Sequence, residues 1–522
     1  MIESTGLGSK RKSELELLLP TEKKQSSWQG RLIETAGEDC ISRSFLDKSQ
    51  EIFQQDPRNH LLRNVLVNVG VYNASIDSEQ ARKVSHLFSH TAMGDVHVSD
   101  QEESGRCWIF AGLNLLRRYA CTMFSLPKDF NKVKDQSFEF SETYLFFWDQ
   151  LEKANYFLVK SLEKKDLSYE SRELEQLFSE PVYDGGEWEM FANIVKKYGV
   201  VPLKAMPESY HSGFTKQMTS TLNKRLREYA LELRESTKST EQIKERKEEM
   251  MQEIYKILVS FLGQPPKEFD WEFLMNEEQE EQSMLVSMKK MNPHSFLEIL
   301  RPLYNIDDQV VLRHMPHAPA YFQVYELEGL NNVLGGSAIS FLNVPVEDMK
   351  RCAAKSLKDG MPIWFACDVN KGFEPVDGAL STTIFNEDLL FGKSKSLSKD
   401  KRILLRESAA VHAMLITGVN LDEKENPDRW QVENSWGKYV GHRGFLSMSD
   451  AWFDEYVFEI VVDKKYLPRN ASNALKKDAV KIKPWSLLAC KSLSACTCCS
   501  NRKEGLAAKV GMSKKAFSGI KH

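Results

Sequence analysis

The strongest candidate for nucleophilic chemistry in this chain is Cys107, in the run SGRCW at 104–108. The run joins a glycine-containing turn to an apolar stretch that includes Ile109 and Leu113, which predicts a helix beginning at the cysteine. The N–H groups at a helix N-terminus favour the thiolate, which is the reactive form of cysteine. A buried cysteine without a chemical role would suit the same position. Whether Cys107 is catalytic or structural depends on whether the chain also carries the partners that a nucleophile needs.

Two later segments carry the partners that a cysteine nucleophile needs. His412 lies in the run VHAML at 411–415, and Asn434 in the run VENSWG at 432–437. An imidazole can take the thiol proton and later return it to the leaving amine, and an asparagine amide can hold that ring in one orientation. Trp436 can shield their hydrogen bond from water, and we also place it among the residues that bind substrate.

Gln101, six residues before Cys107, completes the candidate site. Its side-chain N–H could donate to the oxyanion that forms when the thiolate attacks a carbonyl, beside the backbone N–H of Cys107. Taken singly, a histidine on a strand and an asparagine before Ser-Trp-Gly are usually structural residues. The four residues in the order Gln101, Cys107, His412, Asn434 favour catalysis by acyl transfer through a thioester.

The order of these residues resembles that of the papain-like cysteine peptidases, and the surrounding segments are similar to the bleomycin hydrolase family. The resemblance covers residues from about 80 to 468 of this chain. It implies an α+β, papain-like two-lobed fold, with a helical lobe, a β-rich lobe, a large helical insertion and an N-terminal helical arm. The matching segments lie at 100–110, 141–149, 184–188, 197–200, 364–369, 411–415 and 432–437.

The same resemblance implies a function. The expected enzyme is a cytoplasmic homohexameric aminopeptidase that acts on peptides with a free N-terminus, on the carboxamide of the glycopeptide bleomycin, and on homocysteine thiolactone. In papain-like enzymes a glycine pair lines the substrate cleft, so Gly185 and Gly186 are expected to bind substrate. Without the resemblance, a glycine pair would indicate only a tight turn.

The chain also departs from papain itself. Ser104 stands where the papain signature has a cysteine, and His412 follows Cys107 by about 300 residues, about twice the papain separation. A large insertion is therefore expected between the two halves of the site. We divide the chain into a polar N-terminus with a helical arm (1–90), a helical catalytic lobe (91–215), a helical insertion with expected oligomer contacts (216–320), a β-rich catalytic lobe (321–470) and a basic, cysteine-containing tail (471–522).

Composition adds limits to this interpretation. The chain has 522 residues, of which 42% are hydrophobic, enough to bury two or three cores. Nine cysteines are too sparse for a disulfide framework, and no apolar run has the length of a membrane span, so no membrane contact is expected. We expect no cofactor and no metal, because the four cysteines of the tail are poorly spaced for tetrahedral zinc. They are Cys490, Cys496, Cys498 and Cys499.

The C-terminal tail leaves one alternative open. Its excess of lysine and arginine could attract nucleic acid, which would suit an oligomeric scaffold with incidental peptidase activity, although a loose basic tail would look the same. By resemblance, the run IKPW at 482–485 begins the C-terminal arm whose carboxylate holds the substrate amine in bleomycin hydrolases. Since this chain continues to His522, we expect weaker selectivity for free amines.

Overall fold

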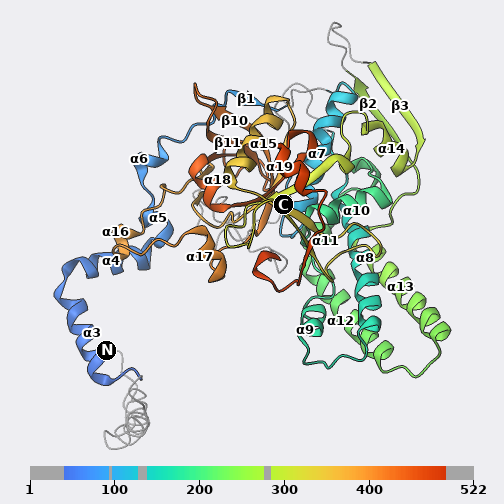
Figure 1. Cartoon of the computed structure of the whole chain (residues 1–522), viewed down its shortest axis with the longest axis horizontal. Helices are drawn as coiled ribbons and strands as arrows, with labels where there is room; N and C mark the ends of the chain where they lie inside the picture. The colour runs from blue at the N-terminus through green and yellow to red at the C-terminus, as the bar shows by residue number, and fades with distance from the viewer. Residues whose placement is uncertain (1–39, 93–96, 127–137, 276–283, 490–522) are drawn as a thin grey trace, which may run out of the picture. The chain divides into compact units, whose positions relative to one another are not determined.

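The computed structural model describes residues 40–92, 97–126, 138–275 and 284–489 (Figure 1). The chain divides into two compact units, one made of Met1–Ile76 with Glu387–Lys393 and the other of Asp77–Asn386 with Ser394–His522. The tail cysteines from Cys490 onward, and most of the basic tail, lie outside the described residues. Within the described part of the chain, no helix has the length and hydropathy needed to cross a membrane.

The first unit contains two successive helices, α3 (Arg43–Gln55) and α4 (Pro57–Asn68). Helix α3 begins at Ser42, whose hydroxyl accepts a hydrogen bond from the Phe45 N–H at 3.1 Å. Helix α4 begins with a proline behind Asp56, a combination that favours a helix start. Neither helix buries a residue. The short helices of this unit are α5 (Val71–Ser75) and α16 (Asp388–Phe391).

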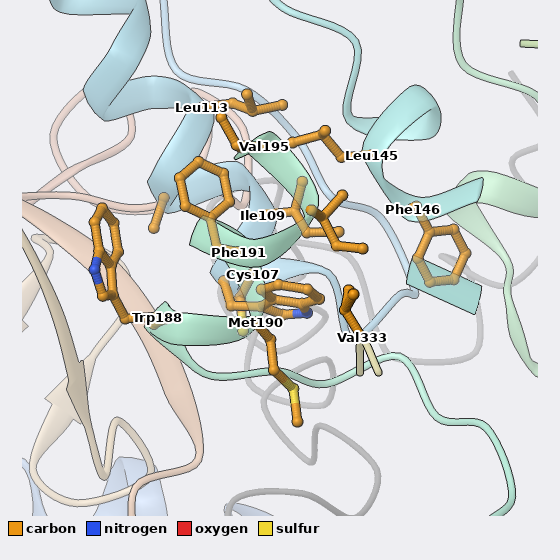
Figure 2. Packing of buried hydrophobic residues seen from close by; sticks show 14 of the residues in the cluster. Cys107, Ile109, Leu113, Leu145, Phe146, Trp188, Met190, Phe191, Val195 and Val333 are labelled. Carbon is orange, nitrogen blue, oxygen red and sulfur yellow. The ribbon is translucent and has the colours of Figure 1, made fainter. Parts of the chain in front are cut away.

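The helical part of the second unit is built around α7 (Cys107–Met123), α8 (Glu142–Glu163) and α10 (Trp188–Tyr198). Their facing side chains are apolar at helical spacing, and each fully buried one contributes about 1.5–3 kcal/mol to stability. Figure 2 shows Ile109 and Leu113 of α7 beside Phe191 and Val195 of α10 and Leu145 of α8. The helices approach closely at Gly112, where a Cβ would lie 2.5 Å from the Phe191 ring.

The segment expected to be a helical insertion is partly helical. Helices α12 (Lys216–Arg234) and α13 (Thr240–Leu262) pack against each other and against α8 (Figure 1). The expected apolar face of α12 is confirmed, but the buried face of α13 runs through Met250, Ile254, Leu258 and Leu262, while the expected Ile257 and Phe261 are half-buried. The antiparallel pair β2 (Phe269–Met275) and β3 (Met284–Met291), followed by α14 (Pro293–Leu300), was not expected.

The remaining strands form one large sheet in the order β14-β5-β6-β4-β13-β7-β10-β11-β12-β9-β8, with β1 paired to β10. The central strand β7 (Ile363–Cys367) is apolar at every position because both its faces are buried. Helix α7 packs on one face beside Trp364 and Ala366, and α15 (Val346–Lys358) packs on the other. The predicted α+β class is confirmed. Strand β4 (Gln309–Arg313) corrects the predicted start of the β-rich lobe at 321.

Four further strands complete the part of the sheet that holds the site. They are β10 (His412–Leu421), β11 (Pro427–Glu433), β12 (Phe445–Ser449) and β13 (Val457–Asp463). The other strands are short: β1 (His90–Thr91), β5 (Gln323–Leu327), β6 (Ser340–Asn343), β8 (Phe373–Glu374), β9 (Ala379–Leu380) and β14 (Val480–Ile482). The other helices are α6 (Ser78–Ala81), α9 (Arg172–Ser179), α11 (Tyr210–Gly213), α17 (Lys399–Leu404), α18 (Asp450–Tyr456) and α19 (Arg469–Ala474).

The predicted tail boundary at 471 is also wrong. Ala471 and Ala474 of α19 are buried, and β14 pairs in parallel with β5. The chain therefore stays in the packed core as far as Ala489, which is buried as well. The stretch contains many basic residues, but its buried apolar side chains pack it into the core.

Candidate active site

Cys107 is the first residue of α7, as the sequence predicted. Its side chain is buried, with 7% of the residue exposed, and it lines a cavity of about 410 Å³. Arg106 at the N-cap position makes no capping hydrogen bond with its side chain, so the N–H groups and partial positive charge of the helix end act on the cysteine. The placement favours a nucleophilic thiolate.

Arg106 fixes the start of the nucleophile helix, a role that the sequence did not reveal. Its guanidinium is fully buried and makes a two-pronged ion pair with Glu208, at 3.0 and 2.7 Å. Its Nε also donates to the Ser104 hydroxyl at 3.0 Å. Burial would raise the pKa of Glu208, but the charge and hydrogen bonds of Arg106 hold it below its usual value. Glu208 therefore stays ionised and anchors the residue next to the nucleophile.

His412 is the first residue of β10 and lines the same cavity as Cys107. Its Nε2 lies 2.9 Å from Oδ1 of Asn434, which can only accept, so the proton is on Nε2. The Nδ1 atom has no hydrogen-bond partner among the described residues. The Trp436 ring stacks on the imidazole with 4.7 Å between centroids. The base is thus held by two residues on separate sides and keeps one nitrogen available for a proton.

Burial determines the protonation state of His412. The side chain is enclosed, which lowers its pKa to about 4, against a smaller opposing effect of the Asn434 hydrogen bond. The imidazole is therefore neutral at neutral pH when the thiol is also neutral. A neutral imidazole is the form that can accept the thiol proton.

This burial makes stability depend on pH. In a Cys107→Ser protein, where no thiolate can pair with the imidazolium, folded His412 stays neutral down to about pH 4, whereas the unfolded residue titrates at about 6.5. The unfolded state binds more protons between these values, so lowering the pH from 6.5 to 4 should remove about 3 kcal/mol of stability. Urea unfolding of Cys107→Ser and of Cys107→Ser/His412→Gln would measure it. The double variant should lack this loss, and equal pH slopes would contradict the assignment.

Asn434 follows the last residue of β11, and an ion-pair network ties that strand to the nucleophile helix. Glu433 binds Arg117 of α7 at 2.8 Å and pairs with Arg118 as well. These three side chains are at most 2% exposed, so the network is screened from solvent. The Asn434 Oδ1 atom also accepts from the Ser435 N–H at 2.8 Å. The helix that carries Cys107 and the residue that orients His412 are thereby held together.

Gln101 is fully buried and its amide is oriented at both ends. Its Oε1 accepts from the Ser435 hydroxyl at 2.6 Å, and its Nε2 donates to the Ser104 carbonyl at 2.6 Å. An amide nitrogen carries two hydrogens, so one remains for a developing oxyanion. Gln101 does not itself line the cavity. The oxyanion role predicted for it remains a prediction.

Gly185 and Gly186 both line the cavity, as does Glu187 beside them. At position 186 the packing of the protein itself requires glycine, because a Cβ there would lie 2.5 Å from the Trp108 indole. The predicted substrate contacts of the pair remain a prediction. Trp436, which the sequence also predicts to contact substrate, is not among the described residues that line the cavity, and its position on His412 favours the shielding role instead.

Lys153 of α8 holds the glycine segment in place, a function that sequence reasoning missed. Its ammonium donates to the carbonyls of Tyr183 at 2.8 Å and Gly185 at 2.7 Å, and it pairs with Asp149 at 2.7 Å. The intervening carbonyl of residue 184 accepts from the Trp108 indole N–H at 2.8 Å. Three successive carbonyls of this cavity wall are thus bound from behind. The spacing of Asp149 and Lys153 by one helical turn was the available signal.

Lys153→Met should destabilise the protein by about 3–5 kcal/mol, because it leaves the fully buried Asp149 carboxylate without its counter-charge. Urea unfolding would measure the loss. The double variant Lys153→Met/Asp149→Asn should recover much of the stability, since the unpaired charge is then gone. A single variant as stable as the wild type would show that this ion pair does not hold the wall.

Comparison with protein-family models identifies the family to which this chain belongs. The model of the Peptidase C1-like family matches residues 40–489. The chain belongs to the Peptidase C1-like family. The resemblance to papain-like cysteine peptidases is therefore confirmed, and the chain is a cysteine peptidase of this family.

This Peptidase C1-like enzyme matches several relatives over nearly their whole length. Aminopeptidase C of Listeria monocytogenes is 35% identical over 84% of this chain and 96% of its own. Human bleomycin hydrolase is 35% identical over 82% of this chain and 94% of its own. The crystal structure of PepW from Lactobacillus rhamnosis superposes with a TM-score of 0.80 at 33% identity, covering 87% of this chain and 99% of that one. The predicted α+β papain-like fold is confirmed, and the enzyme is a cysteine aminopeptidase of the bleomycin hydrolase type.

Proposed function

We propose that this peptidase removes N-terminal residues from peptides through a thioester on Cys107. One observation supports it above the others: Cys107 and His412 share a cavity, with Asn434 bound to the far nitrogen of the imidazole. The arrangement supplies a nucleophile, a base and an orienting group in one place. The names of the relatives, aminopeptidase C and bleomycin hydrolase, support exopeptidase action at a free N-terminus.

The reaction proceeds in two acyl transfers. Nδ1 of His412 takes the proton of the Cys107 thiol, and the sulfur attacks the carbonyl carbon of the first peptide bond. The carbonyl electron pair moves to oxygen, which faces the Cys107 backbone N–H and the second amide hydrogen of Gln101. Collapse breaks the C–N bond, and the imidazolium protonates the leaving amine. Water then attacks the thioester, the imidazole takes its proton, and the C–S bond breaks to free the thiol and the amino acid.

Smaller acyl substrates fit the same chemistry. The carboxamide of bleomycin offers an amide for the same attack, in line with the name of the bleomycin hydrolases that this chain resembles. Homocysteine thiolactone offers an acyl carbon that is already activated as a thioester. Each is processed by attack of Cys107 and release of the nitrogen or sulfur leaving group.

We also propose a homohexamer that works in the cytoplasm. Helices α3 and α4 expose apolar side chains and bury none, so contact with another copy of the chain would remove this surface from water. The five cysteines that the structure describes are free thiols, a state that a reducing compartment preserves. The exposed apolar residues are Phe45, Leu46, Ile52, Phe53, Leu61 and Val67.

A substrate panel tests this proposal. Aminoacyl fluorophores with a free amine, compared with N-acetylated forms and with internally quenched N-blocked peptides, measure kcat/KM for exopeptidase and endopeptidase action separately. We expect cleavage of the free-amine substrates with at least about tenfold preference over the acetylated forms. Equal cleavage of free and blocked substrates would overturn aminopeptidase action and leave a general cysteine peptidase.

A further inference from the structure

The active-site cavity is lined in part by helix α12, which belongs to the insertion. Residues 182–186, called the wall segment below, line the cavity, and so do Thr215, Thr219 and Asn223. Thr215 directly precedes α12, and the other two residues follow it at intervals of four. Side chains at this spacing lie on one face of a helix. The insertion therefore presents a polar face to the wall segment.

Asn223 holds the beginning of the wall segment. Its side-chain oxygen accepts a hydrogen bond from the Val182 N–H at 2.8 Å, and its amide nitrogen donates to the Val182 carbonyl at 3.0 Å. A single side chain thus binds both backbone groups of one wall residue. Two hydrogen bonds to the same residue fix its orientation as well as its position. At this end, the wall segment is joined to α12.

Asp184, in the middle of the wall segment, joins it to the nucleophile. Its carboxylate accepts hydrogen bonds from the Thr219 hydroxyl at 3.0 Å, from the Thr215 hydroxyl, and from the Gly105 N–H at 3.2 Å. Gly105 lies two residues before Cys107, and a Cβ on it would lie 2.8 Å from the Asp184 Cβ. One carboxylate therefore binds both α12 and the turn that leads into the nucleophile helix.

The two threonine hydroxyls determine how this carboxylate is oriented. Thr219 binds Oδ1, while Thr215 binds Oδ2, the oxygen that also accepts from Gly105. With both oxygens bound by α12, the plane of the carboxylate is fixed and Oδ2 faces the backbone of the turn. Without the hydroxyls, the Asp184 side chain would be free to change rotamer, and water in the cavity would compete for its oxygens.

We propose that Asp184 is a positioning residue that sets the distance between the wall segment and the nucleophile, and that Thr215 and Thr219 hold it in the required orientation. A peptide bound along the glycine pair then presents its carbonyl carbon to Cys107 at the distance needed for attack. A displacement of about 1 Å in such an alignment can lower the rate about 10²-fold. The inference rests on the proposed attack of Cys107 on a peptide bond and adds the residues that align the substrate with it.

Removing the two hydroxyls from the full chain, with charge and size kept, tests the inference. In Thr215→Val/Thr219→Val we expect kcat for a free-amine fluorogenic peptide to fall at least about tenfold, with KM changed less than about threefold. The rate at which iodoacetamide alkylates Cys107 should stay within about twofold of the wild-type rate, because this small reagent needs the thiolate but not the wall segment. A role confined to stabilising the fold would not separate kcat from the alkylation rate.

Two further variants are the controls. Thr215→Ser/Thr219→Ser keeps both hydroxyls and should restore the wild-type kcat. Thr221→Val removes a hydroxyl from the exposed face of the same helix, where it bonds to a carbonyl of α12 itself, and should leave kcat and KM unchanged. If the double valine variant does not fold, the single variants Thr215→Val and Thr219→Val take its place. One of them must then lower kcat at least about threefold without slowing alkylation.

The outcomes separate the inference from the function on which it rests. An unchanged kcat in a folded Thr215→Val/Thr219→Val enzyme overturns the inference while the proposed function stands. A rise in KM alone also overturns it, because the threonines would then contact substrate directly. An equal fall in kcat and in the alkylation rate does the same, since it would show a general loss of site structure. A wild-type enzyme that does not cleave the free-amine peptide overturns the proposed function, and this inference with it, before any variant is compared.

Discussion

Cys107→Ser should lower kcat/KM at least about 10⁴-fold while leaving the fold unchanged. Serine keeps the size and the hydrogen-bonding capacity of the side chain, but its hydroxyl does not ionise at the pH where a neutral His412 can take the proton. The helix start at Cys107 depends on Arg106 and on the apolar face of α7, and neither is altered. Steady-state kinetics with a free-amine fluorogenic peptide, together with thermal unfolding, would measure both parts.

Cys352→Ser is the matched control for this variant. Cys352 is also a buried thiol, but it belongs to α15 and donates to the Tyr466 carbonyl at 3.4 Å, a bond that serine can keep. Its kcat/KM should stay within a few-fold of the wild type. Turnover retained in Cys107→Ser, or lost equally in Cys352→Ser, would contradict the assignment of the nucleophile.

His412→Ala should lower kcat/KM by about 10³–10⁴-fold, because the thiol then has no base and the leaving amine has no acid. The rate at which iodoacetamide alkylates Cys107 near neutral pH should fall as well, since less thiolate is present.

Asn434→Ala should lower kcat/KM less than His412→Ala does, by about 10²-fold, because the imidazole remains but loses the hydrogen bond that fixes its orientation. Rapid kinetics and timed alkylation would measure this order of effects.

His314→Ala controls for the loss of a buried imidazole. His314 is buried and burial lowers its pKa to about 4, as for His412, yet it stacks on Tyr321 and does not line the cavity. Its removal should leave kcat/KM nearly unchanged, in contrast to the loss expected for His412→Ala. Equal losses in the two variants would attribute the effect to packing and contradict a role as base.

The sequence predicted those parts of the site that are encoded locally or by a fixed order of residue types. Cys107 begins a helix because a turn precedes an apolar helical face, and both features lie within twenty residues. His412 begins a strand of buried apolar residues, which short-range patterns also indicate. The resemblance then supplied the long-range pairing of Cys107, His412 and Asn434, because spacing alone cannot bring together residues so far apart in sequence.

The features that sequence reasoning missed depend on contacts between distant elements. Arg313 and Glu187 are separated by more than a hundred residues. In the sequence neither can be told from an ordinary surface charge, but the fold buries them as an ion pair. The antiparallel pair β2–β3 was missed because the segment that contains it was predicted to belong to a helical insertion. The tail boundary failed because a basic composition outweighed the apolar residues that pack as far as Ala489.

Trapping of the acyl-enzyme is the measurement that most directly tests catalysis by Cys107. The wild-type enzyme is mixed with a free-amine aminoacyl ester, quenched in acid within the first turnover, and analysed by intact mass and by peptide mapping. We expect a mass increase equal to the acyl group, carried by the peptide that contains Cys107 and absent from Cys107→Ser. Turnover without an adduct on that peptide, or an adduct on another residue, would contradict a thioester mechanism at Cys107.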